Sequence, residues 1–231
     1  MKLPEPMHHG ILLKRYKRFL ADIRLRDGTE ITAHCPNTGR MKGCDIPGSP
    51  VILSRSNNPK RKLPFTWELV KTNDTWVGIN THLPNKLVIE AITEEKIPEL
   101  TGFTRLRREV PYAENSRIDI LLENDARKCY VEVKNVTLAI GGAAAFPDAV
   151  TKRGQKHLRD LMQMVKSGHR SVIFFLINRG DVTRFTPADD VDPVYGKLLR
   201  EAVKFGVEAL ACQTLITPPI IKVAHPVPIL L

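Results

Sequence analysis

The stretch that decides the fold reads Arg-Ile-Asp-Ile-Leu-Leu over residues 117–122 and Tyr-Val-Glu-Val-Lys-Asn-Val over residues 130–136. Both segments are rich in apolar and β-branched residues, so each predicts a strand. Side chains alternate across a strand, which puts Glu132 and Lys134 on one face and the valines between them on the other. We therefore expect the valines to enter the core and the charged face to meet Asp119 on the neighbouring strand.

The charged residues of these two strands suit a divalent cation. Two neighbouring carboxylates repel each other, and carboxylate oxygens together with water are typical ligands of Mg²⁺ or Mn²⁺. A metal held by Asp119 and Glu132 would polarise a phosphodiester and activate a water molecule, while Lys134 would orient that water or stabilise the developing charge. The alternative interpretation is an ordinary exposed ion pair between Glu132 and Lys134, worth under ~1 kcal/mol.

The elements around these strands follow a recognisable order. Hydrophobic periodicity predicts helices at 84–100, 151–167 and 193–205, and strands at 106–112, 117–123, 128–136, 171–177 and 207–212. This order implies a mixed sheet flanked by helices, and PD-(D/E)xK nucleases place two acids and a lysine in the same order.

The first helix and a glycine- and alanine-rich stretch of this region allow two further predictions. An acid from the first helix often completes such nuclease sites, and Glu90 is the candidate. The alternative for Glu90 is the exposed side of an amphipathic helix. The glycine- and alanine-rich residues 141–145 predict a mobile loop.

The first third of the chain has a different pattern. Short strand candidates occur at 12–25, 30–34, 51–54, 65–71 and 76–80, separated by turn-forming residues. Five short strands in so short a stretch favour a small antiparallel barrel of the OB type.

The chain is thus predicted to have two domains and an α/β (α+β) fold class. Residues 1–83 form an OB-like, DNA-binding β-barrel, and residues 84–231 form a PD-(D/E)xK nuclease-like domain with a mixed sheet flanked by helices.

The charge balance points to a polyanionic partner. The chain has 35 Lys and Arg against 25 Asp and Glu, a formal charge of +10, and residues 1–85 hold 14 and 7 of these. DNA is the expected partner of so basic a chain. The alternatives are a basic enzyme without a polyanionic partner, or a basic surface that is merely solvated.

Four groups of basic residues are candidates for contact with DNA. They are Arg40 and Lys42 in a polar loop, Lys60, Arg61 and Lys62 beside two aromatic residues, Arg105, Arg107 and Arg108 near the domain junction, and Lys152, Arg153, Lys156 and His157 on the first turns of a helix. Cations beside Phe65 and Trp67 have the composition of a groove that binds single-stranded DNA or the DNA backbone. Cations at a helix N-terminus favour phosphate. The alternatives are simple turn chemistry for the first group, a basic hairpin tip with two core aromatic residues for the second, and a solvated helix face for the fourth.

The sequence also predicts a cytoplasmic location. The longest strongly apolar run, residues 172–177, is far shorter than the ~18–20 residues that a membrane-spanning helix needs, and the first residues lack the apolar core of a secretory signal. The four cysteines form no C-x-x-C pair, so we expect reduced, mostly buried thiols rather than a zinc site or disulfides.

Several motifs together resemble the sugar fermentation stimulation protein A family. These motifs are residues 16–22, 34–39, 117–119, 130–134, 146–151, 153–158 and 172–175. The resemblance covers nearly the whole chain in the same order. It implies an OB-like domain followed by a PD-(D/E)xK-like domain, non-specific DNA binding and a regulatory role in maltose metabolism. It also makes Asp119, Glu132 and Lys134 the equivalents of the nuclease triad.

Two functions follow as expectations. The first is a non-specific DNA-binding protein with a phosphodiesterase site that uses Mg²⁺ or Mn²⁺. The second is a non-catalytic DNA-binding regulator of sugar (maltose) metabolism. The complete set of Asp119, Glu132 and Lys134 favours the first, and the lack of a helix-turn-helix pattern speaks against a sequence-reading regulator. A homodimer is left open.

Overall fold

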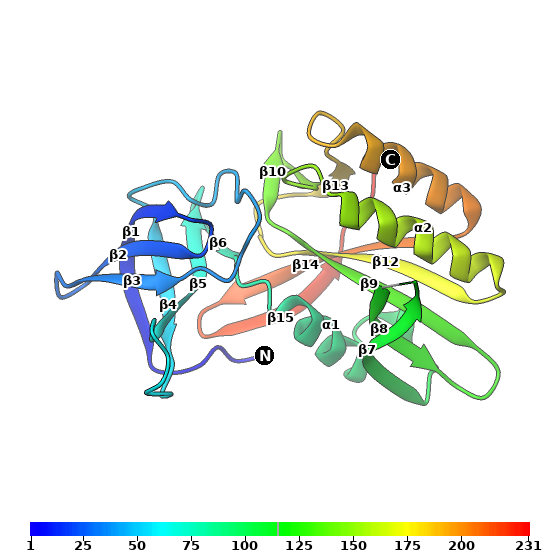
Figure 1. The fold of residues 1–231 in the computed structure, drawn as a ribbon, viewed down its shortest axis with the longest axis horizontal. Helices are drawn as coiled ribbons and strands as arrows, with labels where there is room; N and C mark the ends of the chain where they lie inside the picture. Colours follow the sequence, from blue (N-terminus) through cyan, green and yellow to red (C-terminus); the bar gives the residue numbers. More distant parts are fainter. Residues whose placement is uncertain (115) are drawn as a thin grey trace.

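The structure is a computed structural model that describes residues 1–114 and 116–231. It has two parts that lie side by side, a β-barrel built from the first third of the chain and a larger α/β part (Figure 1). This architecture confirms the predicted fold class.

The barrel has six strands in the order β3-β2-β1-β4-β5-β6, and a parallel contact between β3 and β5 closes it. The strands are β1 (Met7–Tyr16), β2 (Leu20–Leu25), β3 (Glu30–His34), β4 (Pro50–Arg55), β5 (Phe65–Thr72) and β6 (Thr75–Gly78). Six strands replace the predicted five because residues 12–25 form a hairpin. The chain reverses at Lys17 and Arg18, which both have positive φ.

The main sheet of the second part has the order β15-β14-β12-β9-β8-β7. Its strands are β7 (Arg105–Ala113), β8 (Ser116–Glu123), β9 (Lys128–Val136), β12 (Arg170–Ile177), β14 (Glu208–Thr217) and β15 (Ile220–Pro226). The central strands β9, β12 and β14 are parallel, and the outer strands pair antiparallel. The apolar run of β12 is buried, as the continuous apolar pattern predicts.

Three helices cover this sheet, with α1 (Pro84–Thr93) on one face and α2 (Lys152–Lys166) and α3 (Pro193–Phe205) on the other (Figure 1). Alternation along β12 explains both contacts, since Phe174 packs with α1 and Phe175 packs with α2 and α3. No helix in the described part of the chain is long and apolar enough to cross a membrane.

Two predictions about this part were wrong. The first helix ends at Thr93 rather than near residue 100, and a short 3₁₀ helix (Pro98–Leu100) follows. Residues 141–145 are not a mobile loop but the end of a hairpin of β10 (Leu138–Ile140) and β11 (Ala143–Phe146). Gly141 and Gly142 form the turn at positive φ, a common hairpin signal. The alanines of β11 are buried, and β11 pairs with β13 (Arg184–Pro187), so small side chains indicate close packing here.

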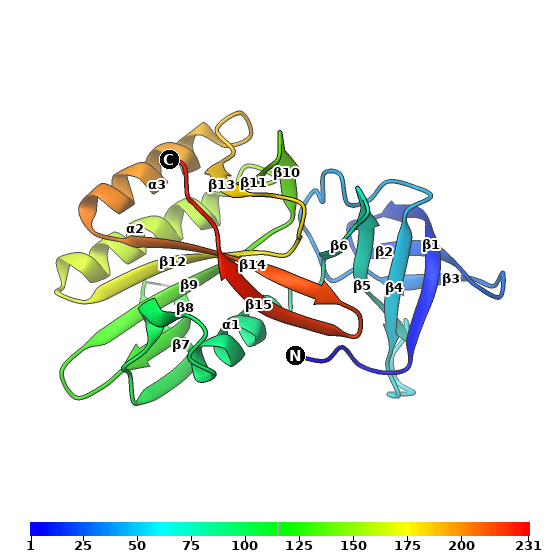
Figure 2. The same ribbon diagram turned by 180° about the vertical axis from the view of Figure 1, so that it is seen from behind.

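The barrel and the α/β part are joined by an apolar contact and by hydrogen bonds. Ile52 and Leu69 of the barrel belong to the same core cluster as Leu87 and Val88 of α1. The N-terminal segment crosses to the main sheet beside β15, where Lys2 pairs with Ile220 (Figure 2). The domains are therefore packed against each other rather than tethered by a free linker.

The loop after β3 contacts the α/β part through the carboxylate of Asp148 and through Cys44, whose Sγ lies 3.8 Å from the carbonyl oxygen of Thr137. The backbone N–H of Met41 donates to Asp148 Oδ2 at 2.9 Å. Arg15 shapes this loop from the barrel side by donating to the carbonyls of Asn37 and Gly39 at 2.9 and 2.8 Å. Asp148 thereby fixes the position of the loop that carries Arg40 and Lys42.

We expect Asp148→Ala to release this loop. A hydrogen bond to a charged acceptor contributes about 1.5–3 kcal/mol, so backbone amide exchange over residues 37–43 should accelerate about tenfold or more. Hydrogen–deuterium exchange read by mass spectrometry measures this directly. Asp148→Asn keeps an acceptor oxygen and should change the exchange much less. Exchange in Asp148→Ala at the rate of the parent would show that the loop is held by other contacts.

Candidate active site

Asp119 lies where the ladder between β8 and β9 stops. The last pair of this region is Ile120 with Val131, and the same antiparallel register continued by one residue places Asp119 opposite Glu132. Here the Asp119 side chain replaces the ladder, because its Oδ2 accepts the backbone N–H of Val133 at 2.8 Å. Its Oδ1 accepts from Asn85 Nδ2 of α1 at 2.8 Å, so both oxygens are fixed.

Glu132 and Lys134 share a face of β9, as the alternation predicts, and Val131 and Val133 pack in the core beside α1. The Glu132 side chain is only 3% exposed, and its Oε1 accepts from Lys134 Nζ at 2.7 Å. The same Oε1 contacts His157 Nδ1. Its Oε2 is buried and has no hydrogen-bond partner within the described residues. The pair is therefore not an exposed surface ion pair, which removes that alternative.

The two carboxylates have opposite pKa shifts. Burial, and next the charge of Glu132, raise the pKa of Asp119 to about 6. Burial alone would raise the pKa of Glu132, but the Lys134 ammonium and then His157 hold it below its ordinary value. At neutral pH the interior must hold both charges, and an ionised Asp119 destabilises the fold as the pH rises through about 6. A cation bound between them would relieve this cost.

The carboxylate oxygens of Asp119 and Glu132 are suitable ligands for a hard divalent cation. No group of three or more His, Cys, Asp or Glu side chains in the described ranges gathers in a way that holds a metal ion. The two carboxylates, with the unpartnered Oε2 of Glu132, match Mg²⁺, which keeps several waters and takes one or two carboxylates. Ca²⁺ likewise prefers oxygen ligands.

The start of α2 is fixed by a network of caps. Thr151 Oγ1 accepts from the N–H of Gly154 at 3.0 Å. Asp192, which caps α3 by accepting from Tyr195 N–H at 3.0 Å, also accepts from Thr151 N–H at 2.9 Å. A Cβ on Gly154 would come within 2.8 Å of the Thr151 side chain and 3.2 Å of the Tyr195 ring, so the tight packing requires glycine. The rotation of α2 about its axis is thereby determined.

This rotation separates the four predicted DNA-contact residues of α2. His157 points inward, is 6% exposed and contacts Glu132. Lys156 donates to the carbonyl of Glu114 and to Asp160, both at 2.8 Å. Lys152 and Arg153 are exposed.

A hollow of about 560 Å³ opens beside the cluster. Its lining includes Arg117 of β8 together with Arg153, Lys156 and His157 of α2. Three cations and one acid, Glu109, line this hollow, and His157 in its lining contacts the buried Glu132, so the hollow has a positive balance that suits phosphate.

Glu90 does not join this cluster. Its carboxylate lies 2.7 Å from the amine of Met1, and the residue of α1 that reaches Asp119 is Asn85. Glu90 therefore lies on the partly exposed side of the helix, as the alternative interpretation has it. Nothing in the spacing of the sequence singles out Asn85, which lies just after the proline at the helix start.

The basic residues near the domain junction lie on β7, the edge strand of the main sheet. Arg105 and Arg108 are exposed, and Arg107 pairs with Glu123 at 2.6 Å. Charged side chains on an edge strand prevent pairing with other strands. These arginines thus have a structural explanation beside the predicted contact with DNA.

Of the two aromatic residues predicted to offer a stacking surface beside the basic group before β5, Phe65 is half-buried and Trp67 is buried. Lys60 and Lys62 are exposed, but Arg61 Nη2 donates to Thr66 Oγ1 at 2.8 Å. Trp67 is fully buried and donates its indole N–H to the carbonyl of Leu69 at 2.9 Å. The prediction that Trp67 offers a stacking surface was wrong, because its position on β5 faces the barrel core.

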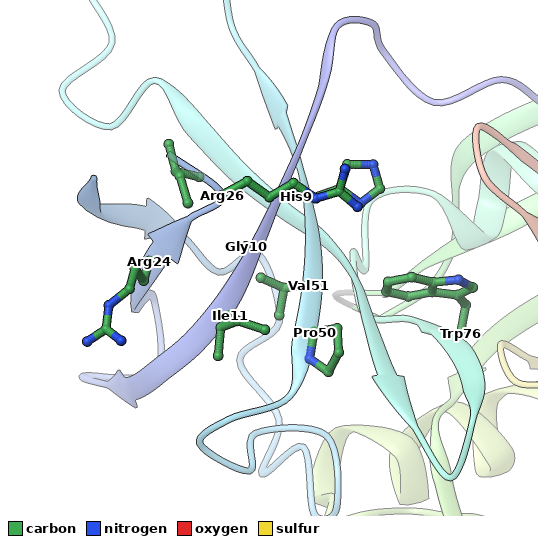
Figure 3. Close-up of a pocket in the computed structure, with 9 residues that line it drawn as sticks. His9, Gly10, Ile11, Arg24, Arg26, Pro50, Val51 and Trp76 are labelled. Atoms are coloured by element: carbon green, nitrogen blue, oxygen red, sulfur yellow. The ribbon is translucent and has the colours of Figure 1, made fainter. Parts of the chain in front are cut away.

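The other tryptophan borders a hollow of about 370 Å³ on the barrel (Figure 3). The rings of His9 and Trp76 lie on one side, and Arg24 lies on the other. Arg24 is engaged by Glu30 at 3.0 Å. This hollow offers a flat ring and cations on elements other than those that hold Asp119 and Glu132.

Comparison with known proteins matches both parts of the chain. A family model described as "Sugar fermentation stimulation protein RE domain" matches residues 82–219, and a model described as "SfsA N-terminal OB domain" matches residues 13–79. A "Sugar fermentation stimulation protein homolog" of Geobacter sulfurreducens is 59% identical over 100% of this chain and 99% of its own length. The homolog of Trichodesmium erythraeum is 56% identical over 90% of this chain and 86% of its own length.

A solved structure agrees with this result. Pyrococcus furiosus SfsA in complex with Ca²⁺ superposes with a TM-score of 0.90 at 29% identity, covering 100% of both chains. Sequence and fold thus match along the whole length, and the chain belongs to the sugar fermentation stimulation protein family.

Proposed function

We propose that this protein binds DNA through its phosphates and hydrolyses phosphodiester bonds with a divalent cation held by Asp119 and Glu132. The observation that carries the proposal is the buried Oε2 of Glu132, which has no partner among residues 1–114 and 116–231 and lies opposite a carboxylate whose pKa is raised to about 6. Burying an unpaired carboxylate oxygen is costly, and a bound cation supplies the missing partner.

The related Pyrococcus furiosus protein supports the choice of cation. Its structure is described as a complex with Ca²⁺, and it matches this chain over the full length. Ca²⁺ and Mg²⁺ are both hard cations that take carboxylate and water ligands. A site for Mg²⁺ or Mn²⁺ at Asp119 and Glu132 is consistent with that relative.

Each residue of the site has a different proposed role. When bound, the cation would lower the pKa of a water molecule and polarise a phosphate oxygen. Asn85 and the N–H of Val133 fix the direction of the Asp119 oxygens. Lys134 Nζ, 2.7 Å from Glu132 and partly accessible, places a positive charge where the phosphate would gain negative charge. Arg117 and Arg153 line the adjoining hollow and would hold the flanking phosphates.

The partner is proposed as DNA recognised by charge rather than by base sequence. The formal charge of +10 and the hollow bordered by cations support this view. The exposed Arg40 and Lys42 lie on the loop that Asp148 fixes to the α/β part, so the barrel can add phosphate contacts.

One observation favours the alternative of a non-catalytic DNA-binding regulator. Lys134 and His157 already contact Glu132, so the carboxylate is partly compensated without a cation. On this view the charged cluster is a structural remnant of a nuclease fold. Cleavage assays decide between the two functions.

We expect nicking of supercoiled plasmid DNA with Mg²⁺ or Mn²⁺ and none with EDTA. Glu132→Gln and Asp119→Asn keep shape but lose charge, so both should abolish nicking. Lys134→Ala should also abolish it while cation binding is retained. Asp125→Asn makes the same charge change at an exposed position of the β8–β9 turn and is the matched control. Equal nicking in parent and Glu132→Gln would trace the activity to a contaminant or to another site.

Cation binding is measured separately from cleavage. A ligand at a hundred times its Kd stabilises the fold by about 2.7 kcal/mol, so millimolar Mg²⁺ or Mn²⁺ should raise the melting temperature of the parent by several degrees. The rise should vanish in Glu132→Gln and persist in Asp125→Asn. A cation-induced rise without nicking would favour the regulator.

We expect DNA affinity to fall steeply with salt, with a slope of log K against log salt of about 0.9 per phosphate contacted. Replacing Lys60, Arg61 and Lys62 with alanine should weaken binding to unrelated sequences equally and should flatten the slope. Fluorescence anisotropy of labelled duplexes gives both quantities, and Lys197→Ala on the exposed side of α3 is the control. If the triple variant binds like the parent, the contacts lie elsewhere, around Arg105–Arg108 or around the start of α2.

A further inference from the structure

We infer that His157 is a positioning residue for Glu132, whose Oε1 it holds through an Nδ1–H so that Oε2 is left for the cation. The inference concerns a residue that the sequence assigns to DNA contact, and it rests on the proposed cation site. The supporting observations are the contacts of the two ring nitrogens of the buried His157 imidazole.

The two neighbours of His157 require the same tautomer. Arg153 Nε lies 3.2 Å from His157 Nε2, and an arginine nitrogen can only donate, so Nε2 must accept. At the other end, Nδ1 contacts Oε1 of the Glu132 carboxylate, which can only accept when ionised. Nδ1 therefore carries the hydrogen. Each contact alone leads to this assignment, and the two agree.

Lys134 completes the arrangement around the same oxygen. Its Nζ lies 2.7 Å from Glu132 Oε1 and 3.2 Å from His157 Nδ1. Two donors cannot bond each other, so their proximity follows from their sharing Oε1 as acceptor. Oε1 thus accepts two hydrogen bonds from the protein, while Oε2 accepts none from any described residue.

The position of the imidazole is set by packing rather than by its own contacts. The first turn of α2 is fixed by Thr151 and Asp192, and Gly154 lets the helix lie against Tyr195. Because His157 is buried on this helix, its ring supplies a rigid donor to a strand residue. Partners that orient a metal-binding carboxylate change metal affinity by about 10–100-fold when they are lost.

The same imidazole connects the site to the hollow. Arg153 is exposed and lines the hollow, while its Nε donates to His157. A phosphate bound by the outer nitrogens of Arg153 would therefore be linked to Glu132 through Arg153 and the imidazole of His157.

The tautomer is testable without any cation. Long-range ¹H–¹⁵N correlation spectra of the metal-free protein distinguish a protonated Nδ1 from a protonated Nε2 in each of the 7 histidines. The signal of His157 is the one that disappears in His157→Gln. We expect protonated Nδ1 and unprotonated Nε2. A protonated Nε2 in the folded parent would overturn the inference.

Three variants then test positioning. His157→Asn places an amide nitrogen near the position of Nδ1 and keeps a donor for Glu132. His157→Gln reaches the position of Nε2 and keeps only the contact with Arg153. His157→Leu keeps volume and removes both contacts. In calorimetric titrations with Ca²⁺, we expect Gln and Leu to lose about 10–100-fold in affinity and Asn to retain most of it.

The outcomes separate this inference from the proposed function. Parent-like Ca²⁺ affinity in both His157→Gln and His157→Leu would overturn the positioning role alone, because the parent would still bind Ca²⁺. Absence of Ca²⁺ binding in the parent would overturn the proposed cation site, and the positioning role with it. Melting curves in EDTA identify any variant that fails to fold, and the comparison of Asn with Gln then uses the folded pair.

Discussion

Burial of the Glu132 carboxylate is the constraint on which the rest of the site depends. A charge in the interior of a protein is stable only with partners, and here the partners come from two elements. Lys134 lies two residues further along the same strand and His157 comes from α2, whereas Asp119 on the adjacent strand brings a second negative charge. The rotation of α2 must be correct for Glu132 to be compensated, and the sheet register decides that Asp119 lies beside it.

The same constraint explains features that look unrelated to the site. The caps that Thr151 and Asp192 provide fix α2 and α3 relative to each other, and Gly154 allows their close packing. Asp148, just before α2, fixes the loop of the barrel that follows β3. Barrel, helices and site are therefore connected through the first turns of α2, and the cations of that segment come to border one hollow.

Most of the fold could be predicted from the sequence, because its signals are local. Alternation along residues 130–136 places Glu132 and Lys134 on one face, and the apolar run of β12 identifies a buried central strand. The sequence does not predict the hairpin of β10 and β11. Three alanines after two glycines are typical of a flexible loop, and only the pairing of β11 with β10 and β13 shows that these small side chains allow close packing. Asn85 could not be found either, since its contact with Asp119 depends on how α1 lies across the sheet. The inward direction of His157 likewise depends on the rotation of α2 about its axis. From the sequence alone, its basic neighbours suggest an exposed residue.

We propose that a divalent cation binds between Asp119 and Oε2 of Glu132. Anomalous diffraction from crystals soaked in Mn²⁺ tests it most directly, because the signal locates the ion independently of any assay of activity. We expect an anomalous peak within coordination distance of one Asp119 oxygen and of Glu132 Oε2, and no peak in crystals of Glu132→Gln. A structure of the parent at saturating Mn²⁺ with no peak between these carboxylates would contradict it.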